Sequence, residues 1–133
     1  MSSFTKPLRL EFKDDCTFDL LETFEYYTNK IKHLDGTNVI ITVPVGFNTD
    51  FASVPKVFRS FIAVLDKHAK AAVVHDYLYE HGYDKYVADK IFYEAMTVLE
   101  VSLWKRGIMF IGVRLNTIIK DFLKKEIIWL KKY

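Results

Sequence analysis

The sequence contains one cysteine, three prolines and five glycines among its 133 residues, and it has no long hydrophobic run. Because Cys16 is alone, the chain can form neither an internal disulfide nor a zinc site built from several cysteines. The longest apolar stretch, residues 107–113, ends at Arg114 and falls well short of the ~18 apolar residues that cross a bilayer. We therefore expect a chain that folds without cross-links and has no transmembrane segment.

The composition is typical of one globular domain, since half of the residues are hydrophobic and 27% are charged. A domain of this length buries roughly two-thirds of the surface that its unfolded chain exposes, so its stability requires no metal ion. Any metal ion bound by this chain would therefore serve its function. The first seven residues lack a charged segment followed by an apolar one, which predicts no secretory signal peptide.

Positive charge is concentrated towards the C-terminus. Residues 104–133 carry eight basic and two acidic side chains, whereas residues 1–103 carry 11 basic and 15 acidic ones. Such a segment can contact phosphate, anionic lipid or an acidic partner, but its charges do not form the dense patch that nucleic-acid binding requires. We expect a docked helix with a solvated lysine face and no nucleic-acid partner. Apolar residues near its end indicate protein–protein docking: Ile127, Ile128, Trp129 and Leu130.

The first third of the chain has the pattern of β-strands. Residues 8–13 alternate apolar and polar side chains, and residues 39–43 are rich in β-branched side chains. Residues 18–27 are rich in aromatic side chains and are also predicted to be a strand. Asp35-Gly36 predicts a turn before the last of these strands.

From about residue 56 the apolar residues recur at the three- and four-residue spacing of helices. We predict a short helix over 56–61, a second over 66–79, a third capped by Asp84, and a last over about 104–130 that can bend at its glycines. Strands followed by helices predict an α+β fold, with a small N-terminal antiparallel sheet packed by three to four C-terminal helices. The single domain, residues 1–133, then consists of mainly strands (1–45), a motif loop (46–55), helices (56–103) and a basic amphipathic helix (104–133).

The most unusual segment, residues 43–55, surrounds Asp50 with two prolines, a glycine and capping residues. Such a composition holds a loop in one shape. Asp50 is then either a metal ligand or an acid–base group, with Ser53 beside it, or a carboxylate that accepts backbone N–H bonds and fixes the loop. Local sequence favours the structural role, because aspartates that fix loops and caps outnumber catalytic ones.

The second candidate is His75-Asp76, within an apolar helical segment. Neighbours on a helix point about 100° apart, so both can reach one ion only from a helix edge that faces a cleft. The alternative is a buried histidine bonded to a backbone carbonyl, with Asp76 bonded to nearby tyrosines or amides. Asp89 lies next to a core position of the following helix and could point into the same cleft.

Together, Asp50, His75, Asp76 and Asp89 form a candidate catalytic site, because carboxylate oxygens and an imidazole suit a divalent ion and the water that it activates. Asp50, His75 and Asp76 are the candidate metal ligands, and a divalent metal ion is the one cofactor that these residues indicate. A nucleophilic triad of Ser53, His75 and Asp76 is disfavoured, because no Gly-x-Ser-x-Gly elbow surrounds the serine.

Three motifs follow one another along the chain: VPVGFNTDFASVP at 43–55, AAVVHDYLY at 71–79 and ADKIFYEAM at 88–96. In this order they resemble the domain-of-unknown-function 1353 family, small proteins common in tailed bacteriophages and prophages. The resemblance covers roughly residues 39–115, with Lys85 where an arginine is usual and Glu100 where a glycine is usual. Because the family has no established activity, the resemblance implies phage origin far more strongly than it implies any chemistry. The resemblance also supports a functional site at the four candidate residues, because the three motifs centre on them.

Two functions from different classes remain open. We expect a virion-associated or assembly protein of the phage tail or particle, because the basic C-terminal helix offers a docking surface and the chain lacks a clean catalytic motif. Its partners would be other phage proteins or a second copy of itself, in the virion or in the infected host cytoplasm. The alternative is a small metal-assisted phage hydrolase for a cell-wall or nucleotide substrate, with His75 and one or two aspartates holding the ion.

Overall fold

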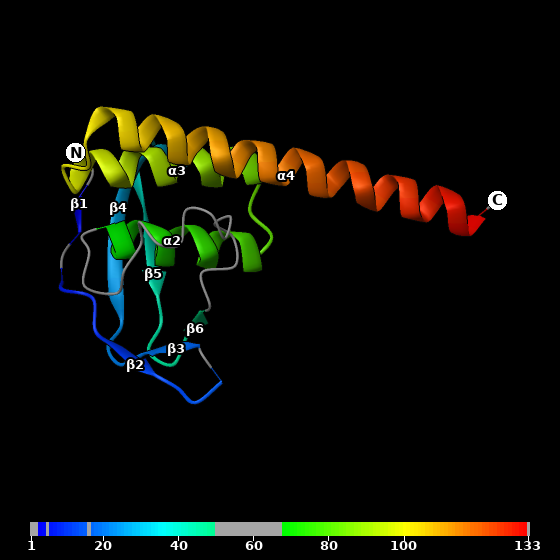
Figure 1. The fold of residues 1–133 in the computed structure, drawn as a ribbon. Helices are drawn as coiled ribbons and strands as arrows, with labels where there is room; N and C mark the ends of the chain where they lie inside the picture. The colour runs from blue at the N-terminus through cyan, green and yellow to red at the C-terminus, as the bar shows by residue number, and fades with distance from the viewer. Residues whose placement is uncertain (1–2, 5, 16, 50–67, 133) are drawn as a thin grey trace.

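Two small antiparallel sheets precede three helices in the computed structural model, which describes residues 3–4, 6–15, 17–49 and 68–132. The helices lie side by side on one side of the larger sheet, and the C-terminal half of the last helix extends beyond the rest of the described chain (Figure 1). The predicted α+β class is confirmed. The strands form two three-stranded sheets, where the sequence predicted one.

The larger sheet has the strand order β1-β4-β5 and the smaller one the order β2-β3-β6. The strand bounds are β1 Ser3–Phe4, β2 Leu10–Phe12, β3 Phe18–Leu20, β4 Phe24–Lys32, β5 Asn38–Val43 and β6 Asn48–Thr49. The segment predicted as one strand over 18–27 contains the end of β3 and the start of β4, which belong to different sheets. A chain that leaves one sheet for another must change direction, and periodicity does not reveal such a change.

The β4–β5 hairpin carries the sheet side of the core. Phe24, Tyr26 and Thr28 alternate along β4 and are buried, since successive side chains of a strand point to opposite faces. Tyr26 pairs with Ile41 in the antiparallel register. The predicted turn is confirmed, because Gly36 has a φ of 85°, a left-handed conformation that glycine adopts without steric cost.

Three helices follow: α2 His68–Glu80, α3 Lys85–Val98 and α4 Leu103–Lys132. Each runs antiparallel to the one before it (Figure 1). The predicted cap of α3 is confirmed, because the Asp84 carboxylate accepts a hydrogen bond of 3.0 Å from the backbone N–H of Val87. The short helix predicted over 56–61, and the start of the helix predicted over 66–79, lie outside the described residues.

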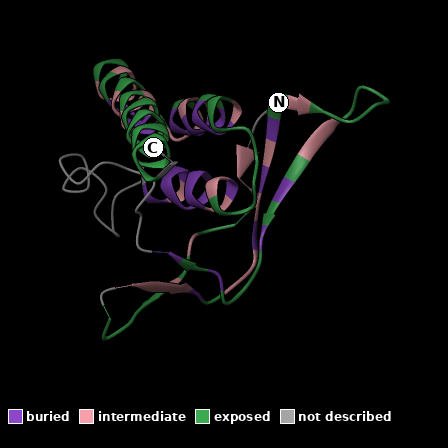
Figure 2. Ribbon diagram, turned by 90° about the vertical axis from the view of Figure 1, so that its right-hand side faces the viewer, coloured by how far each residue is buried: buried purple, intermediate pink, exposed green. Residues whose placement is uncertain are grey.

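The core lies between the sheet and the first two helices. α3 contacts β4, while α2 contacts β5 and β6. Figure 2 shows the buried residues gathered on α2, α3 and the facing strands, with exposed residues along the outer side of α4. The largest fully buried side chains include Phe24, Tyr26, Leu78, Ile91, Phe92 and Met96.

The last helix is continuous through both glycines at which the sequence allowed a bend. It docks through Met109, Val113 and Thr117, which are at most 4% exposed and lie about one turn apart. The apolar side chains that recur along its opposite side face solvent, between 46% and 61% exposed: Ile108, Ile111, Leu115, Ile118 and Phe122. Every residue from Ile118 to Lys131 is exposed. None of the described helices is long and apolar enough to cross a membrane.

The backbone of the turn between α3 and α4 is strained at Glu100. Glu100 has a φ of 60°, and no other non-glycine residue of the described chain has a positive φ. The backbone N–H of Val101 donates to the carbonyl of Met96 at 3.0 Å, so the turn closes the end of α3. Glycine adopts this left-handed conformation without the steric cost that the Cβ of Glu100 brings.

Candidate functional site

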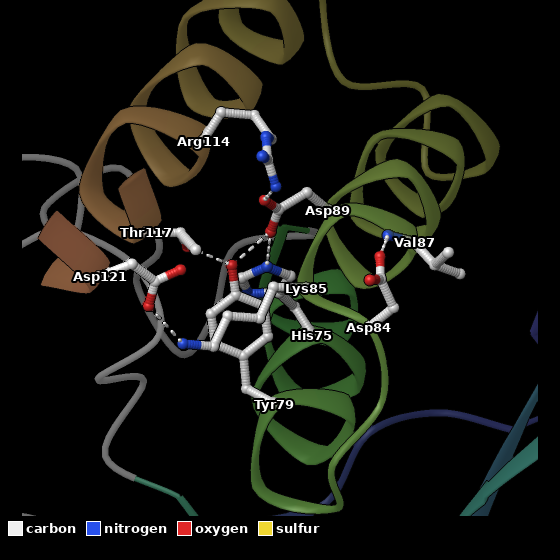
Figure 3. A network of polar contacts seen from close by, with 9 residues as sticks. All are labelled: His75, Tyr79, Asp84, Lys85, Val87, Asp89, Arg114, Thr117 and Asp121. Atoms are coloured by element: carbon white, nitrogen blue, oxygen red, sulfur yellow. Dashed lines mark hydrogen bonds and ion pairs between the residues drawn. The ribbon is translucent and has the colours of Figure 1, made fainter. Parts of the chain in front are cut away.

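The Asp89 carboxylate is the centre of a buried polar network between the three helices. Asp89 lies on α3 and is completely buried. It accepts bonds from two side chains of α2 and one of α4, so a single carboxylate connects all three helices (Figure 3). A buried carboxylate is costly unless it is paired and hydrogen-bonded, and Asp89 meets both conditions.

His75 and Tyr79 provide the α2 side of this network. They are four residues apart, so they lie on the same face of the helix. The Nε2 of His75 and the hydroxyl of Tyr79 each lie 2.6 Å from Oδ1 of Asp89, and the two rings are 4.3 Å apart. His75 is completely buried and also packs against the ring of Phe92 on α3.

The direction of these hydrogen bonds follows from the chemistry of the groups. An ionised carboxylate only accepts, so Nε2 of His75 carries a proton and donates it to Asp89. Tyr79 donates its proton to Asp89, so the bond of 2.6 Å between Tyr79 and Thr117 has the threonine hydroxyl as donor. Burial, followed by the bond to Asp89, raises the pKa of Tyr79, which keeps its proton in place.

Arg114 of α4 supplies the counter-charge. Its Nη1 donates to Oδ2 of Asp89 at 2.9 Å, and its side chain is 24% exposed. A second ion pair between the same helices joins Lys85 to Asp121 at 3.3 Å, but both side chains are about half exposed and water screens their attraction. The buried pair therefore dominates the electrostatics of the site.

Asp76 does not join this network. Its Oδ2 accepts a hydrogen bond of 2.6 Å from the hydroxyl of Thr49 on β6, and the residue is 3% exposed. His75 bonds towards α3 while its neighbour bonds towards the smaller sheet, as the 100° step between helical neighbours requires. Of the four predicted site residues, the structure brings His75 and Asp89 together and directs Asp76 to a different partner.

The remaining candidate, Asp50, lies outside the described residues, as does Ser53. Within the described part of the chain, no group of three or more His, Cys, Asp and Glu side chains could hold a metal ion. The metal site of Asp50, His75 and Asp76 therefore stays a prediction, since one of its three ligands is not described.

A second carboxylate of α3 connects the helices to the sheet. Glu94 accepts hydrogen bonds from the hydroxyls of Tyr26 and Thr28 at 2.7 and 2.8 Å, and from the backbone N–H of Asn29 at 3.3 Å. Its partners come from β4, so this group fixes α3 on the sheet. Among the described residues its hydrogen-bond donors are neutral groups of β4, which makes it a useful reference for a carboxylate that connects a helix to the sheet.

Sequence reasoning missed three members of the Asp89 network. Tyr79 could have been found, because it lies four residues after His75 on the same helix face. Arg114 and Thr117 carry no such signal, since they lie 25 and 28 positions after Asp89 on another helix. Only the packing of α4 on α3 brings them close.

The family model described as Protein of unknown function (DUF1353) matches residues 18–113. The chain belongs to this family. The part matched by the DUF1353 model contains His75, Tyr79 and Asp89, whereas Arg114 and Thr117 lie just beyond its end. The exposed half of α4 is also outside it. No curated protein and no solved structure matches this DUF1353 chain.

Proposed function

We propose that this protein is a small hydrolase in which His75 is the general base and Asp89 orients it. The observation that supports this proposal is the 2.6 Å bond between the His75 ring and the Asp89 carboxylate, both completely buried and held by side chains of three helices. A histidine oriented by a carboxylate is the arrangement that activates water or a hydroxyl nucleophile in many hydrolases.

The proposed step uses the proton positions derived above. His75 takes a proton from a water molecule as the water oxygen bonds to a carbonyl carbon or phosphorus, and the imidazolium then gives that proton to the leaving alcohol or amine. Asp89 stays ionised and stabilises the imidazolium. Arg114 and Tyr79 hold both carboxylate oxygens, so the ring keeps one orientation. Because His75 is completely buried, turnover requires this site to open to substrate.

A divalent ion is part of the proposal through Asp76 and Asp50. A carboxylate has two oxygens, so Asp76 can bond Thr49 through one oxygen and an ion through the other. Such an ion would polarise the carbonyl or phosphoryl group of the substrate. The cell-wall and nucleotide substrates predicted from the sequence both contain bonds of these kinds.

The test compares hydrolysis of three probes by the purified full chain: p-nitrophenyl butyrate, bis-p-nitrophenyl phosphate and purified peptidoglycan, each with and without Mg²⁺ or Ca²⁺. We expect turnover of one probe, and a loss of about 10²–10⁴-fold in His75→Gln, the usual contribution of a general base. Asp89→Asn should also lose activity, because its amide no longer stabilises the imidazolium.

The matched control is Glu94→Gln, which changes another hydrogen-bonded carboxylate of the same helix. It should lower the melting temperature and leave turnover per folded molecule unchanged. Hydrolysis of none of the three probes, or equal losses in Glu94→Gln and Asp89→Asn after correction for folded fraction, would contradict the hydrolase proposal.

The metal component has its own measurement: metal content and melting temperature of the wild type beside Asp50→Ala and His75→Ala, with and without divalent ions. A stoichiometric ion that either substitution releases while the fold survives supports the site. If no ion shifts the melting temperature and both substitutions only destabilise, these residues hold the structure together and bind no metal.

A second candidate is a phage virion or assembly protein that acts through protein–protein contacts. The observation that favours it is the row of exposed apolar side chains along α4, because such a surface is typical of interaction sites. The measurement is quantitative mass spectrometry of purified phage particles from a host that carries this gene. Stoichiometric copies support the assembly function, and complete absence from the particles contradicts a virion role.

A further inference from the structure

An apolar seam runs along the outer side of α4, opposite to the side that docks on α3. Its members are 46–61% exposed and are spaced by four and three residues in alternation: Trp104, Ile108, Ile111, Leu115, Ile118, Phe122 and, one heptad after Phe122, Trp129. This is the seven-residue repeat of a coiled coil, with Lys125 at the one polar position. At 1.5 Å per residue the seam is about 38 Å long.

We propose that this seam pairs with the same seam of a second copy, so that the chain forms an antiparallel homodimer through α4. The repeat supports a helix as the partner, because a seam with a seven-residue repeat matches another helix that has the same repeat. A dimer buries the exposed parts of three aromatic and four aliphatic side chains on each copy. The two copies together then remove about 1,400 Å² of surface from water, within the ~1,200–2,000 Å² of total area that stable interfaces bury.

The charges beside the seam favour the antiparallel orientation. Lys105 and Glu126 occupy equivalent positions of the repeat, three heptads apart on the same edge of the seam. An antiparallel pair places Lys105 beside Glu126 of the partner subunit, twice in each dimer. A parallel pair places Asp121 beside Glu126 of the partner subunit and brings the two lysine-rich ends together, which is repulsive.

The same orientation places apolar residues opposite apolar residues in every layer of the seam except two, in which Lys125 faces Ile108 of the partner subunit. Leu115 faces Ile118 of the partner subunit next to the two-fold axis, and Ile111 faces Phe122 of the partner subunit. The two tryptophans meet at the ends of the interface. The C-terminal half of α4 projects beyond the other helices (Figure 1). In the antiparallel dimer, this half would cover the exposed seam on the docked half of the partner's α4.

Lysine positions argue against a membrane surface as the occupant. A helix that lies on an anionic bilayer has basic side chains at the margins of its apolar face, where they reach the headgroups. Lys105 borders the seam and Lys125 lies within it, but Lys120, Lys124 and Lys131 lie on the side of α4 opposite to the seam, by the 100° step of the helix. On a bilayer these three would point away from the lipid.

The first experiment is sedimentation equilibrium of the full chain over a wide range of concentration. We expect the wild type to sediment as a dimer and Leu115→Glu/Ile118→Glu as a folded monomer, with helix content checked by circular dichroism. The control is Ile127→Glu, an exposed apolar residue of the same helix outside the seam, which should remain dimeric. A monomeric wild type, or dissociation by the control as well, would overturn the proposal.

A monomeric wild type that co-sediments with phosphatidylglycerol vesicles, and stops doing so in Leu115→Glu/Ile118→Glu, would assign the seam to a membrane and overturn the dimer. The second experiment tests orientation by charge reversal. Lys105→Glu and Glu126→Lys should each weaken the dimer about tenfold, and the double variant should restore it, because only antiparallel pairing joins these two positions. Failure of the double variant to restore association would overturn the antiparallel orientation.

Discussion

Two carboxylates, Asp89 and Glu94, fix α3 against its neighbouring elements through hydrogen bonds. Each carboxylate lies on α3 and accepts three hydrogen bonds from neighbouring elements. Glu94 has neutral donors, whereas Asp89 has an arginine and a histidine among its partners. The charged arginine makes the Asp89 site sensitive to substitution.

Removing the counter-charge of Asp89 should be costly. We expect Arg114→Met to lower the free energy of unfolding by about 2–3 kcal/mol, somewhat below the ~3–5 kcal/mol of a fully buried pair because Arg114 is 24% exposed. Lys85→Met, which breaks the exposed pair with Asp121, should cost less than about 1 kcal/mol. Urea denaturation measures both, and similar costs for the two variants would refute the assigned importance of the buried pair.

Tyr79 should govern stability at alkaline pH. Its pKa is raised in the folded state, so above about pH 10 the unfolded chain has released a proton that the folded chain still holds. The contribution of Tyr79 is therefore complete below about pH 10 and is lost as the pH rises further.

We expect the melting temperature of the wild type to fall more steeply above about pH 10 than that of Tyr79→Phe. At neutral pH the free energy of unfolding of Tyr79→Phe should be lower by about 1 kcal/mol, because the variant lacks the hydrogen bond to Asp89. Tyr83→Phe, at an exposed position, should follow the wild type. Parallel alkaline curves for the wild type and Tyr79→Phe would show that Tyr79 has no such effect.

Among the elements, the turn from α3 to α4 contains strain that a substitution can relieve. Glu100 has a φ of 60°, which a residue with a Cβ adopts at a cost and glycine does not. We expect Glu100→Gly to be more stable than Glu100→Ala by about 1 kcal/mol, because both lose the glutamate side chain and only glycine removes the strain. Thermal melts compare the two variants, and an alanine variant that is equally stable would argue against strain at this turn.

The elements that sequence predicted well are those with a strong local pattern. The β-branched segment 39–43 became β5, and Asp84 caps α3, because alternation and capping act between near neighbours in the chain. The division of residues 18–27 between two sheets depends on contacts that are distant in the sequence. The exposed seam of α4 looks like a core stripe by periodicity alone, since an apolar stripe does not reveal which partner covers it.

The candidate site was predicted in part for a similar reason. His75 and Asp89 stand in an apolar helical context that marked them as unusual, and the structure joins them. His75 and Asp76 are adjacent in the sequence, but their side chains bond to different elements, because neighbours on a helix point about 100° apart. The bond of Arg114 to Asp89 could not be predicted from the sequence, because it depends on the packing of α4 on α3.

The whole molecule divides into a packed part and an exposed part. The sheets, α2, α3 and the first half of α4 share the core, while α4 beyond Thr117 has only exposed residues among those whose burial is described. If the dimer forms, this second half has a partner, and the melting temperature should rise with protein concentration. The charge distribution follows the same division, with the basic residues concentrated after residue 103.

The bonds of Asp89 to α2 and α4 also affect how the folded chain opens. Separating either helix from α3 would remove one or two of the three hydrogen bonds of the buried Asp89 carboxylate, so the two helices should not detach one at a time. Amide protons of α2, α3 and residues 105–117 should therefore exchange with deuterium in a single cooperative event. In Asp89→Leu that event should split, with the amides of α4 exchanging first.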